Sequence, residues 1–146
     1  MTAKVILNPY SNRWQAKTNW PLVDTELKRA GIQFELSVSE RPGGHVTELA
    51  AEATSRGFSP ILVAGGDGTI GEVVNGMAQA SRDKKKQLGP LGIIPLGTAN
   101  DLAHNLKLPL DIPSAVTVIA AGNTSNLDVC QVNDRLFVNN AAIGLE

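Results

Sequence analysis

The sequence has few cysteines, histidines and aromatic residues, and each shortage argues against a class of protein. Cys130 is the only cysteine, so no disulfide can form within one chain and no paired-cysteine metal motif is present. The two histidines, His45 and His104, have no partners at metal-ligand spacing, which disfavours a zinc site. Aromatic residues make up 4% of the chain, so valine, isoleucine, leucine and alanine must fill most of the interior.

Strong net charge and long apolar runs are also missing. The formal net charge is −1, with both signs scattered along the chain. The longest basic run, Lys84–Lys86, is short and predicts a solvated loop tip and no nucleic-acid partner. No apolar stretch approaches the roughly 18 residues that span a bilayer, and the N-terminus lacks the form of a signal peptide. We expect a cytoplasmic protein, with peripheral membrane contact through the basic tip if its substrate is a lipid.

Aliphatic runs alternate with helical patterns along most of the 146 residues, a length that suits one compact domain. Strands are predicted at 4–7, 34–38, 61–64 and 91–95, and helices at about 21–30, 46–56, 70–77, 100–106 and 113–121. The first helix is placed at Pro21 because proline suits a first helical turn. This alternation predicts an α/β fold, a parallel sheet wrapped by helices, with ligands at the carboxyl ends of the strands.

The pattern changes after Gly122. Two strand-like runs, 127–132 and 136–139, flank Asn133-Asp134, which is a hairpin signal. The chain then ends on an apolar stretch without a polar tail. We therefore expect a fragment, with an α/β domain over 1–124 and the first strands of a truncated β-rich second domain over 125–146. Uncovered strand edges tend to pair between chains, so a homodimer is a further expectation.

The strongest local signal for chemistry is Gly65–Thr69 (Gly-Gly-Asp-Gly-Thr), between a buried strand and a helix. Its glycines permit a tight turn with positive φ angles and a close approach of the backbone to a ligand. The helix that starts near Ile70 directs free N–H groups at this turn, which favours an anionic phosphate. Asp67 suits a Mg²⁺ organiser or the base that takes a proton from an attacking hydroxyl. A plain helix cap is the alternative interpretation.

Two further loops have the same character. In Pro95–Asp101, Gly97 allows a close approach, Thr98 offers a hydroxyl, and the last two residues suit a helix cap. Asn8–Ser11 follows the first strand. Because the carboxyl ends of parallel strands share one edge of a sheet, we expect all three loops to converge there. This convergence is the main argument from the residues for a nucleotide site.

Other candidate residues also have structural alternatives. Glu72 and Asn75 lie three apart on one face of the helix after the glycine turn. A carboxylate in the first turn, such as Glu72, also simply stabilises the helix dipole. His45 follows two glycines near a helix start, where it can contact a nucleotide. Trp14 and Trp20 are expected to pack locally.

The sequence is similar to the catalytic domain of diacylglycerol kinases and of the related sphingosine and ceramide kinases. Val63–Gly76 (VAGGDGTIGEVVNG) resembles one signature of that family, and Gly92–Ala103 (GIIPLGTANDLA) resembles a second. Asn8–Ser11 and Arg41–His45 match weaker family motifs. The resemblance runs from about Lys4 to the end of the chain.

The resemblance implies an α/β domain of the NAD kinase and diacylglycerol kinase type that binds ATP and Mg²⁺ at its edge. It also implies a second, β-sandwich domain that completes the site for a lipid acceptor. The γ-phosphate of ATP would pass to a lipid hydroxyl such as that of diacylglycerol, and the isolated fragment would be inactive. Carried over by position, Asp67 lies beside the transferred phosphate as base or Mg²⁺ organiser. The residues assigned to nucleotide binding are Asn8, Ser11, Ser39, His45, Gly65, Gly66, Gly68, Thr69, Glu72, Gly97, Thr98, Asn100 and Asp101.

The chain departs from the family pattern at several positions. Asn12 and Trp14 stand where glycines are common, Gly71 replaces a frequent asparagine and His104 replaces a frequent arginine. Two other hypotheses stay open. NAD kinases share the Gly-Gly-Asp-Gly motif, although Leu96–Asp101 favours the lipid-kinase pattern. A non-catalytic nucleotide-binding module is the hypothesis from another class, because the lipid-binding half is expected outside this chain.

Overall fold

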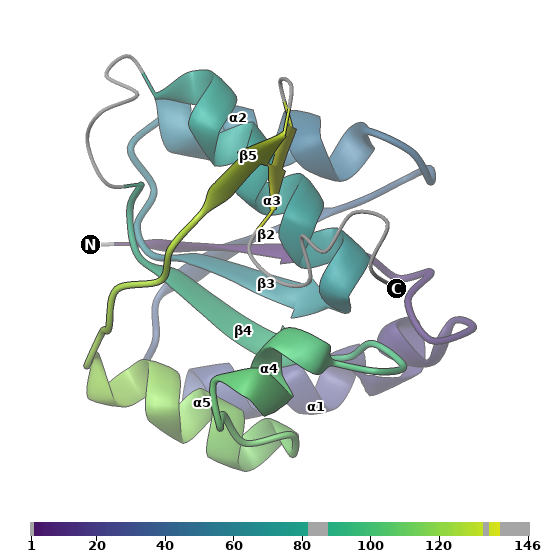
Figure 1. Ribbon diagram of the computed structural model, residues 1–146. Coiled ribbons are helices and arrows are strands. Elements are labelled where there is room, and N and C mark those ends of the chain that lie inside the picture. Colours follow the sequence, from purple (N-terminus) through teal and green to yellow (C-terminus); the bar gives the residue numbers. More distant parts are fainter. Residues whose placement is uncertain (1, 82–87, 133–134, 138–146) are drawn as a thin grey trace.

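The computed structural model describes residues 2–81, 88–132 and 135–137. The elements that precede the final strand pair are β1 (Ala3–Leu7), α1 (Gln15–Arg29), β2 (Phe34–Val38), α2 (His45–Ser55), β3 (Ile61–Gly65), α3 (Asp67–Ala80), β4 (Leu91–Pro95), α4 (Asp101–Asn105) and α5 (Ile112–Ala121). The strands β1 to β4 form one parallel sheet in the order β2-β1-β3-β4 (Figure 1). The predicted α/β fold, a parallel sheet wrapped by helices, is confirmed.

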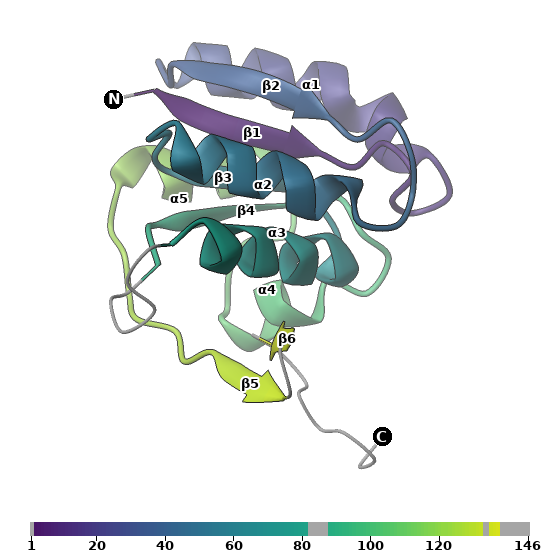
Figure 2. The same cartoon turned by 90° about the horizontal axis from the view of Figure 1, so that it is seen from above.

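Helices cover both faces of this sheet because its central strands, β1 and β3, are aliphatic and buried along their whole length. Alternate strand residues face opposite layers. Val5 and Leu62 lie in a core cluster with α1 and α5. Ile6 and Val63 lie in a second cluster with α2 and α3. Figures 1 and 2 show the resulting three layers, with the sheet between the two helix pairs.

The helices α2 and α3 approach closely because Gly76 has no side chain at their contact. A Cβ atom at this position would meet the carbonyl oxygen of Thr47 and lie 2.7 Å from the Cβ atom of Ala50. The packing of this layer therefore depends on a glycine within a helix, where alanine would otherwise be the better helix former.

Replacing Gly76 with alanine is expected to destabilise the fold by about 1–3 kcal/mol, because the added methyl forces α2 and α3 apart. The measurement is the free energy of unfolding in urea. Gly71→Ala is the matched control on the same helix, since a Cβ atom there meets nothing within 4 Å. That control should be more stable than the wild type by roughly 1 kcal/mol, and equal stability of the Gly76 variant and the control would contradict the tight contact.

The predicted start of the first helix near Pro21 is wrong. The helix α1 begins at Gln15 and contains Pro21 in its interior. Ala16 is fully buried in the first core cluster, and Trp20 packs edge-to-face on Phe34. These tertiary contacts stabilise the turns before the proline, although local propensity alone would not place a helix there.

Other helix ends have common capping residues. Gly31, Gly57 and Gly122 follow α1, α2 and α5, and each has a positive φ angle, which glycine adopts without strain. The N-terminus of α5 is capped by Asp111, whose carboxylate accepts a hydrogen bond from the Ser114 N–H at 3.0 Å. Hydrogen bonds from Ser114 lower the pKa of the Asp111 carboxyl below its ordinary value.

A strand pair follows the α/β layers, as predicted, and its first strand begins at Cys130, later than the expected residue 127. The strands β5 (Cys130–Val132) and β6 (Arg135–Phe137) pair in antiparallel orientation and form a separate sheet. Figure 2 shows this pair apart from the four-stranded sheet. The predicted turn Asn133-Asp134, the end of the chain and the Lys84–Lys86 tip lie outside the described residues. The domain boundary after residue 124 stays a prediction.

The strand β6 is attached to α3 by one side chain. The Asn75 Oδ1 atom accepts a hydrogen bond from the Leu136 N–H at 2.9 Å, and the Asn75 Nδ2 atom donates to the Leu136 carbonyl oxygen at 3.0 Å. Asn75 thus pairs with the strand as a neighbouring strand would. Within the described part of the chain, no helix is long and apolar enough to cross a membrane.

Candidate functional site

A cleft of 590 Å³ opens at the carboxyl ends of β1, β3 and β4, where the loops that follow these strands meet (Figure 1). The predicted site residues that line it are Asn8, Ser11, Ser39, Gly66, Asp67, Gly68, Thr69, Glu72, Gly97 and Thr98. The structure therefore brings together most of the set, from loops that are far apart in the sequence. His45, Gly65, Asn100 and Asp101 do not line the cleft and hold the surrounding loops instead.

Gly66 and Gly97 bring the loop after β3 and the loop after β4 into direct contact. A Cβ atom on Gly66 would lie 2.9 Å from the Cα atom of Gly97, and a Cβ atom on Gly97 would clash with the Cα atom of Gly66. The sequence predicted positive φ angles in the glycine turn, which is wrong, because no residue of Gly65–Thr69 has one. Glycine is required here by a backbone contact between loops and not by an unusual dihedral angle.

Asp67 joins these two loops through its carboxylate. Its Oδ2 atom accepts a hydrogen bond from the Asp101 N–H at 2.8 Å, and its Oδ1 atom accepts one from the Leu102 N–H at 3.0 Å. Both donors belong to the first turn of α4, so Asp67 caps a helix other than its own. Asp67 also lines the cleft, and each carboxylate oxygen has further acceptor capacity.

The predicted capping of α4 by Asn100 is wrong, because the Asp67 carboxylate accepts hydrogen bonds from the first turn of this helix. The Asn100 side chain makes no cap hydrogen bond, and its residue has a positive φ angle of 53°. Its Oδ1 atom accepts from the Gly97 N–H at 3.0 Å, and its Nδ2 atom donates to the Gly97 carbonyl oxygen at 3.1 Å. Asn100 therefore closes the loop on itself, and Asp67 supplies the cap.

The first loop is held by hydroxyl groups of the other two. The Asn8 Nδ2 atom donates to the Thr69 Oγ1 atom at 3.0 Å, and the Ser11 Oγ atom lies 3.5 Å from the same hydroxyl. The Thr98 Oγ1 atom donates to the Asn12 Oδ1 atom at 3.2 Å. Asn12, at a position where the family commonly has glycine, thus connects the first loop to the loop after β4.

A fourth segment, the loop between β2 and α2, is held by Glu72. The Glu72 Oε1 atom accepts a hydrogen bond from the Gly44 N–H at 3.0 Å. The first two turns of α3 therefore carry Asp67, Thr69 and Glu72, and each side chain fixes a different loop. Among the described residues, no side-chain cap hydrogen bond is present at Gly66, the N-cap residue of α3, although the first residues of this helix line the cleft.

His45 and Ser39 shape the loop between β2 and α2. The His45 Nδ1 atom accepts a hydrogen bond from the Glu40 N–H at 2.9 Å, which directs its ring to the loop backbone. Ser39 is buried, and its hydroxyl donates to the Arg41 carbonyl oxygen at 2.9 Å. Of these two predicted residues, the structure places Ser39 in the cleft lining and His45 behind the loop.

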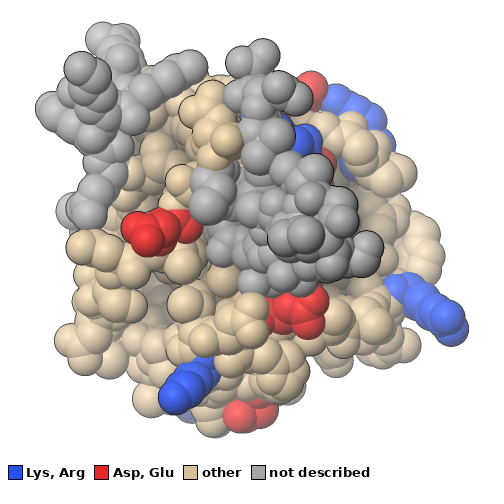
Figure 3. Space-filling view, in the orientation of Figure 1, with Lys and Arg blue, Asp and Glu red and all other residues tan. Residues whose placement is uncertain are grey.

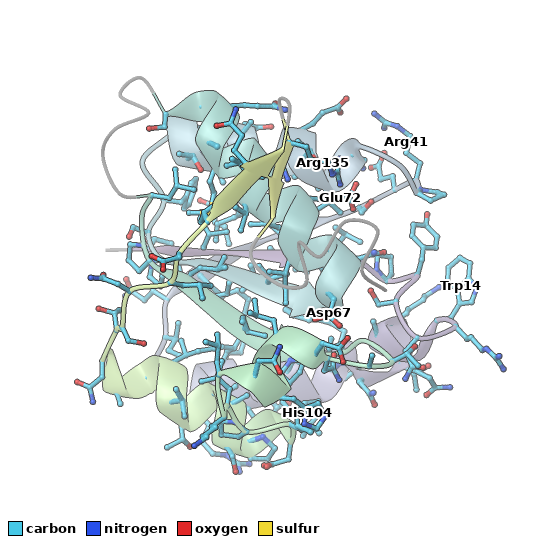
Figure 4. All side chains as sticks on the ribbon, viewed as in Figure 1. Trp14, Arg41, Asp67, Glu72, His104 and Arg135 are labelled. Carbon is cyan, nitrogen blue, oxygen red and sulfur yellow. The ribbon has the colours of Figure 1, made fainter. Side chains whose placement is uncertain are left out.

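Eight residues of the cleft were not among the predicted site residues: Tyr10, Asn12, Arg41, Pro42, Gly43, Val46, Ala99 and Arg135. The Tyr10 hydroxyl donates to the Glu40 carbonyl oxygen at 2.6 Å, and its ring contacts Trp14 edge-to-face. Tyr10 and Arg41 lie inside the weaker motifs, so the motifs could have identified them. Arg135 lies on β6, and no motif in the sequence around it indicates a place in the site. Figure 4 shows it extending from the strand pair toward the region of Glu72.

The charges of the cleft are mixed. Asp67 and Glu72 supply carboxylates, and Arg41 and Arg135 supply guanidinium groups. The Arg41 guanidinium lies 3.1 Å from the Glu48 carboxylate, so its charge is already paired. Over the described surface of the face seen in Figure 3, acidic and basic side chains are scattered, as the sequence predicted.

Comparisons with known proteins match almost the whole of this chain. The sequence model of the family described as "Diacylglycerol kinase catalytic domain" matches residues 2–132. The chain is 39% identical to a diacylglycerol kinase of Staphylococcus saprophyticus and 42% identical to one of Staphylococcus haemolyticus, in each case over 97% of this chain. It covers 45% and 41% of those relatives, so it spans less than half of their length.

Solved structures give the same result. A crystal structure described as a diacylglycerol kinase from Bacillus anthracis superposes with a TM-score of 0.77 and 27% sequence identity. That likeness covers 97% of this chain and 49% of the other. A second structure from the same organism, described as a putative diacylglycerol kinase, gives the same TM-score of 0.77 with 28% identity.

Proposed function

Because the chain belongs to the diacylglycerol kinase catalytic domain family, we propose that its cleft binds ATP with Mg²⁺ and that the protein transfers the γ-phosphate to a lipid hydroxyl, such as that of diacylglycerol. The observation that carries this proposal is the uncapped N-terminus of α3 at the cleft. Free N–H groups and the positive end of the helix dipole favour phosphate at that point. Two relatives of this chain are named diacylglycerol kinases, which supports the choice of acceptor.

The residues of the cleft fit a magnesium ion that is held partly by phosphate. Among the described residues, no group of three or more histidine, cysteine or acidic side chains could hold a metal ion alone. Magnesium in phosphoryl-transfer sites is usually bound by one or two carboxylates together with phosphate oxygens and water. Asp67 would hold it here, and the ion would neutralise charge on the transferred group.

The chain's own residues contribute mainly by positioning. Asp67, Thr69 and Glu72 fix the loops around the nucleotide, so the site is formed before the ligand binds. Gly66 and Gly97 leave room for the backbone to approach phosphate. The second role that we propose for Asp67 is to accept the proton of the attacking hydroxyl. Phosphoryl transfer needs little more from a protein than position and charge stabilisation.

The proposed function predicts that Mg·ATP binds to this chain in an isothermal titration and that adenosine binds more weakly. The phosphates should account for the difference, since they would lie at the α3 N-terminus. The complete product of the gene, supplied with labelled ATP, should then phosphorylate diacylglycerol in mixed micelles and leave NAD unmodified. If only NAD became labelled, the activity would be that of an NAD kinase instead. Binding without transfer to either acceptor would favour a non-catalytic nucleotide module.

A further inference from the structure

The only described cations in the cleft are Arg41 and Arg135, and they differ in their partners. Arg41 is paired with Glu48 at 3.1 Å. For Arg135, no carboxylate of the described residues lies within 4.0 Å, and its side chain is exposed to the cleft. A phosphate chain brought into a cleft that already contains two carboxylates needs a compensating positive charge. Arg135 is the cation that is available to supply it.

Arg135 is also held in place. It precedes Leu136, whose backbone N–H and carbonyl groups are both hydrogen-bonded to the Asn75 side chain at 2.9 Å and 3.0 Å. Asn75 is buried on α3, the same helix whose N-terminus forms part of the cleft. The position of the Arg135 backbone relative to the glycine turn is therefore fixed through one helix. Figure 4 shows the side chain directed from β6 toward the side of the cleft where Glu72 lies.

We propose that Arg135 is a phosphate-binding residue of the nucleotide site and that Asn75 is the positioning residue that holds it over the cleft. A guanidinium group suits this task, because its planar N–H groups bind phosphate oxygens in pairs and its charge is permanent. The nucleotide would then lie between the α3 N-terminus on one side and the strand pair on the other. The inference rests on the proposed function, since it requires a nucleotide in the cleft.

The test compares nucleotide affinities by calorimetry for the wild type, Arg135→Gln, Arg135→Lys and a control, Arg56→Gln. Arg56 follows α2 and precedes β3, at the opposite edge of the sheet, and its removal changes the net charge equally. The Arg135→Gln variant should lose about 10-fold to 100-fold in affinity for Mg·ATP and Mg·ADP, and should bind adenosine as the wild type does. Arg135→Lys should recover part of the loss, and Arg56→Gln should bind as the wild type does.

Asn75→Ala provides a second and independent variant, because Asn75 does not line the cleft. It should weaken Mg·ATP binding in the wild-type background and have no further effect in the Arg135→Gln background. Urea unfolding of each variant shows that the compared proteins are folded.

The outcomes separate the inference from the function on which it rests. If Arg135→Gln bound Mg·ATP as tightly as the wild type does, the inference would be overturned and the proposed function would stay intact. An equal loss for adenosine and ATP would also overturn it, since the residue would then act on the shape of the cleft. If the wild type binds none of these nucleotides, the proposed function fails and the inference fails with it.

Discussion

Replacing Asp67 with asparagine is expected to lower the rate of phosphate transfer to the lipid by about 10²-fold to 10⁴-fold, the usual contribution of a general base. The amide keeps the shape of the carboxylate but removes its charge, so it neither accepts the proton nor holds Mg²⁺. The measurement is the turnover of labelled ATP with diacylglycerol by the complete gene product. Asp24→Asn is the control. Asp24 is paired with Lys28 on the surface of α1, and this substitution removes the same charge as Asp67→Asn.

The same substitution tests the structural role of Asp67. Both of its carboxylate oxygens accept N–H groups of α4, at 2.8 Å and 3.0 Å. An asparagine offers one acceptor and directs an NH₂ group at the second N–H, which leaves a donor unpaired at a cost of about 1–3 kcal/mol. We therefore expect a lower free energy of unfolding together with the loss of turnover. Undiminished turnover would contradict the assignment of Asp67, and lost turnover with wild-type stability would contradict its role as a cap.

Replacing Gly97 with alanine is expected to reduce the affinity for Mg·ATP by more than about 10-fold. The new methyl would clash with the Gly66 Cα atom, so the loops after β3 and β4 must separate. Overpacking of this kind typically costs about 1–3 kcal/mol, and the displaced backbone is the part of the site that approaches phosphate. The measurement is the dissociation constant of Mg·ATP by calorimetry, beside urea unfolding.

The control for this variant is Gly71→Ala, which adds the same methyl to α3 in open space. It should leave the affinity for Mg·ATP at the wild-type level. If Gly97→Ala bound Mg·ATP as tightly as this control, the contact between the two loops would not be needed for the site, and the interpretation of both glycines would be wrong.

The fold was largely predictable because its signals are local. The runs Lys4–Leu7 and Ile61–Ala64 are aliphatic without alternation, which is typical of strands buried on both faces, and both are strands. The start of α1 was not predictable in this way. Pro21 is a strong local signal for a first turn, but the burial of Ala16 against the sheet outweighs it. That contact exists only in the folded molecule.

The sequence predicted most residues of the site, but it did not predict the hydrogen bonds that connect them. The strand-end loops identified Asn8, Asp67 and Thr98 as neighbours, and all of them line one cleft. The hydrogen bond from Asp101 to Asp67 crosses 34 residues, so no sequence spacing indicates it. Arg135 lies in a short strand beyond the α/β layers, and it reaches the cleft through long-range contacts of Leu136, which pairs with Asn75 and packs on the second core cluster.

The attachment of the loops to α3 also determines how the site can open. Three side chains in the first two turns of α3, Asp67, Thr69 and Glu72, each hold a different loop by a hydrogen bond. Local opening of a folded protein proceeds through units that lose their contacts together. Fraying of those two turns would release the surrounding loops at the same moment, whereas an isolated movement of one loop must break its bonds to an intact helix. We therefore expect loosening of these three loops to be coupled through the start of α3.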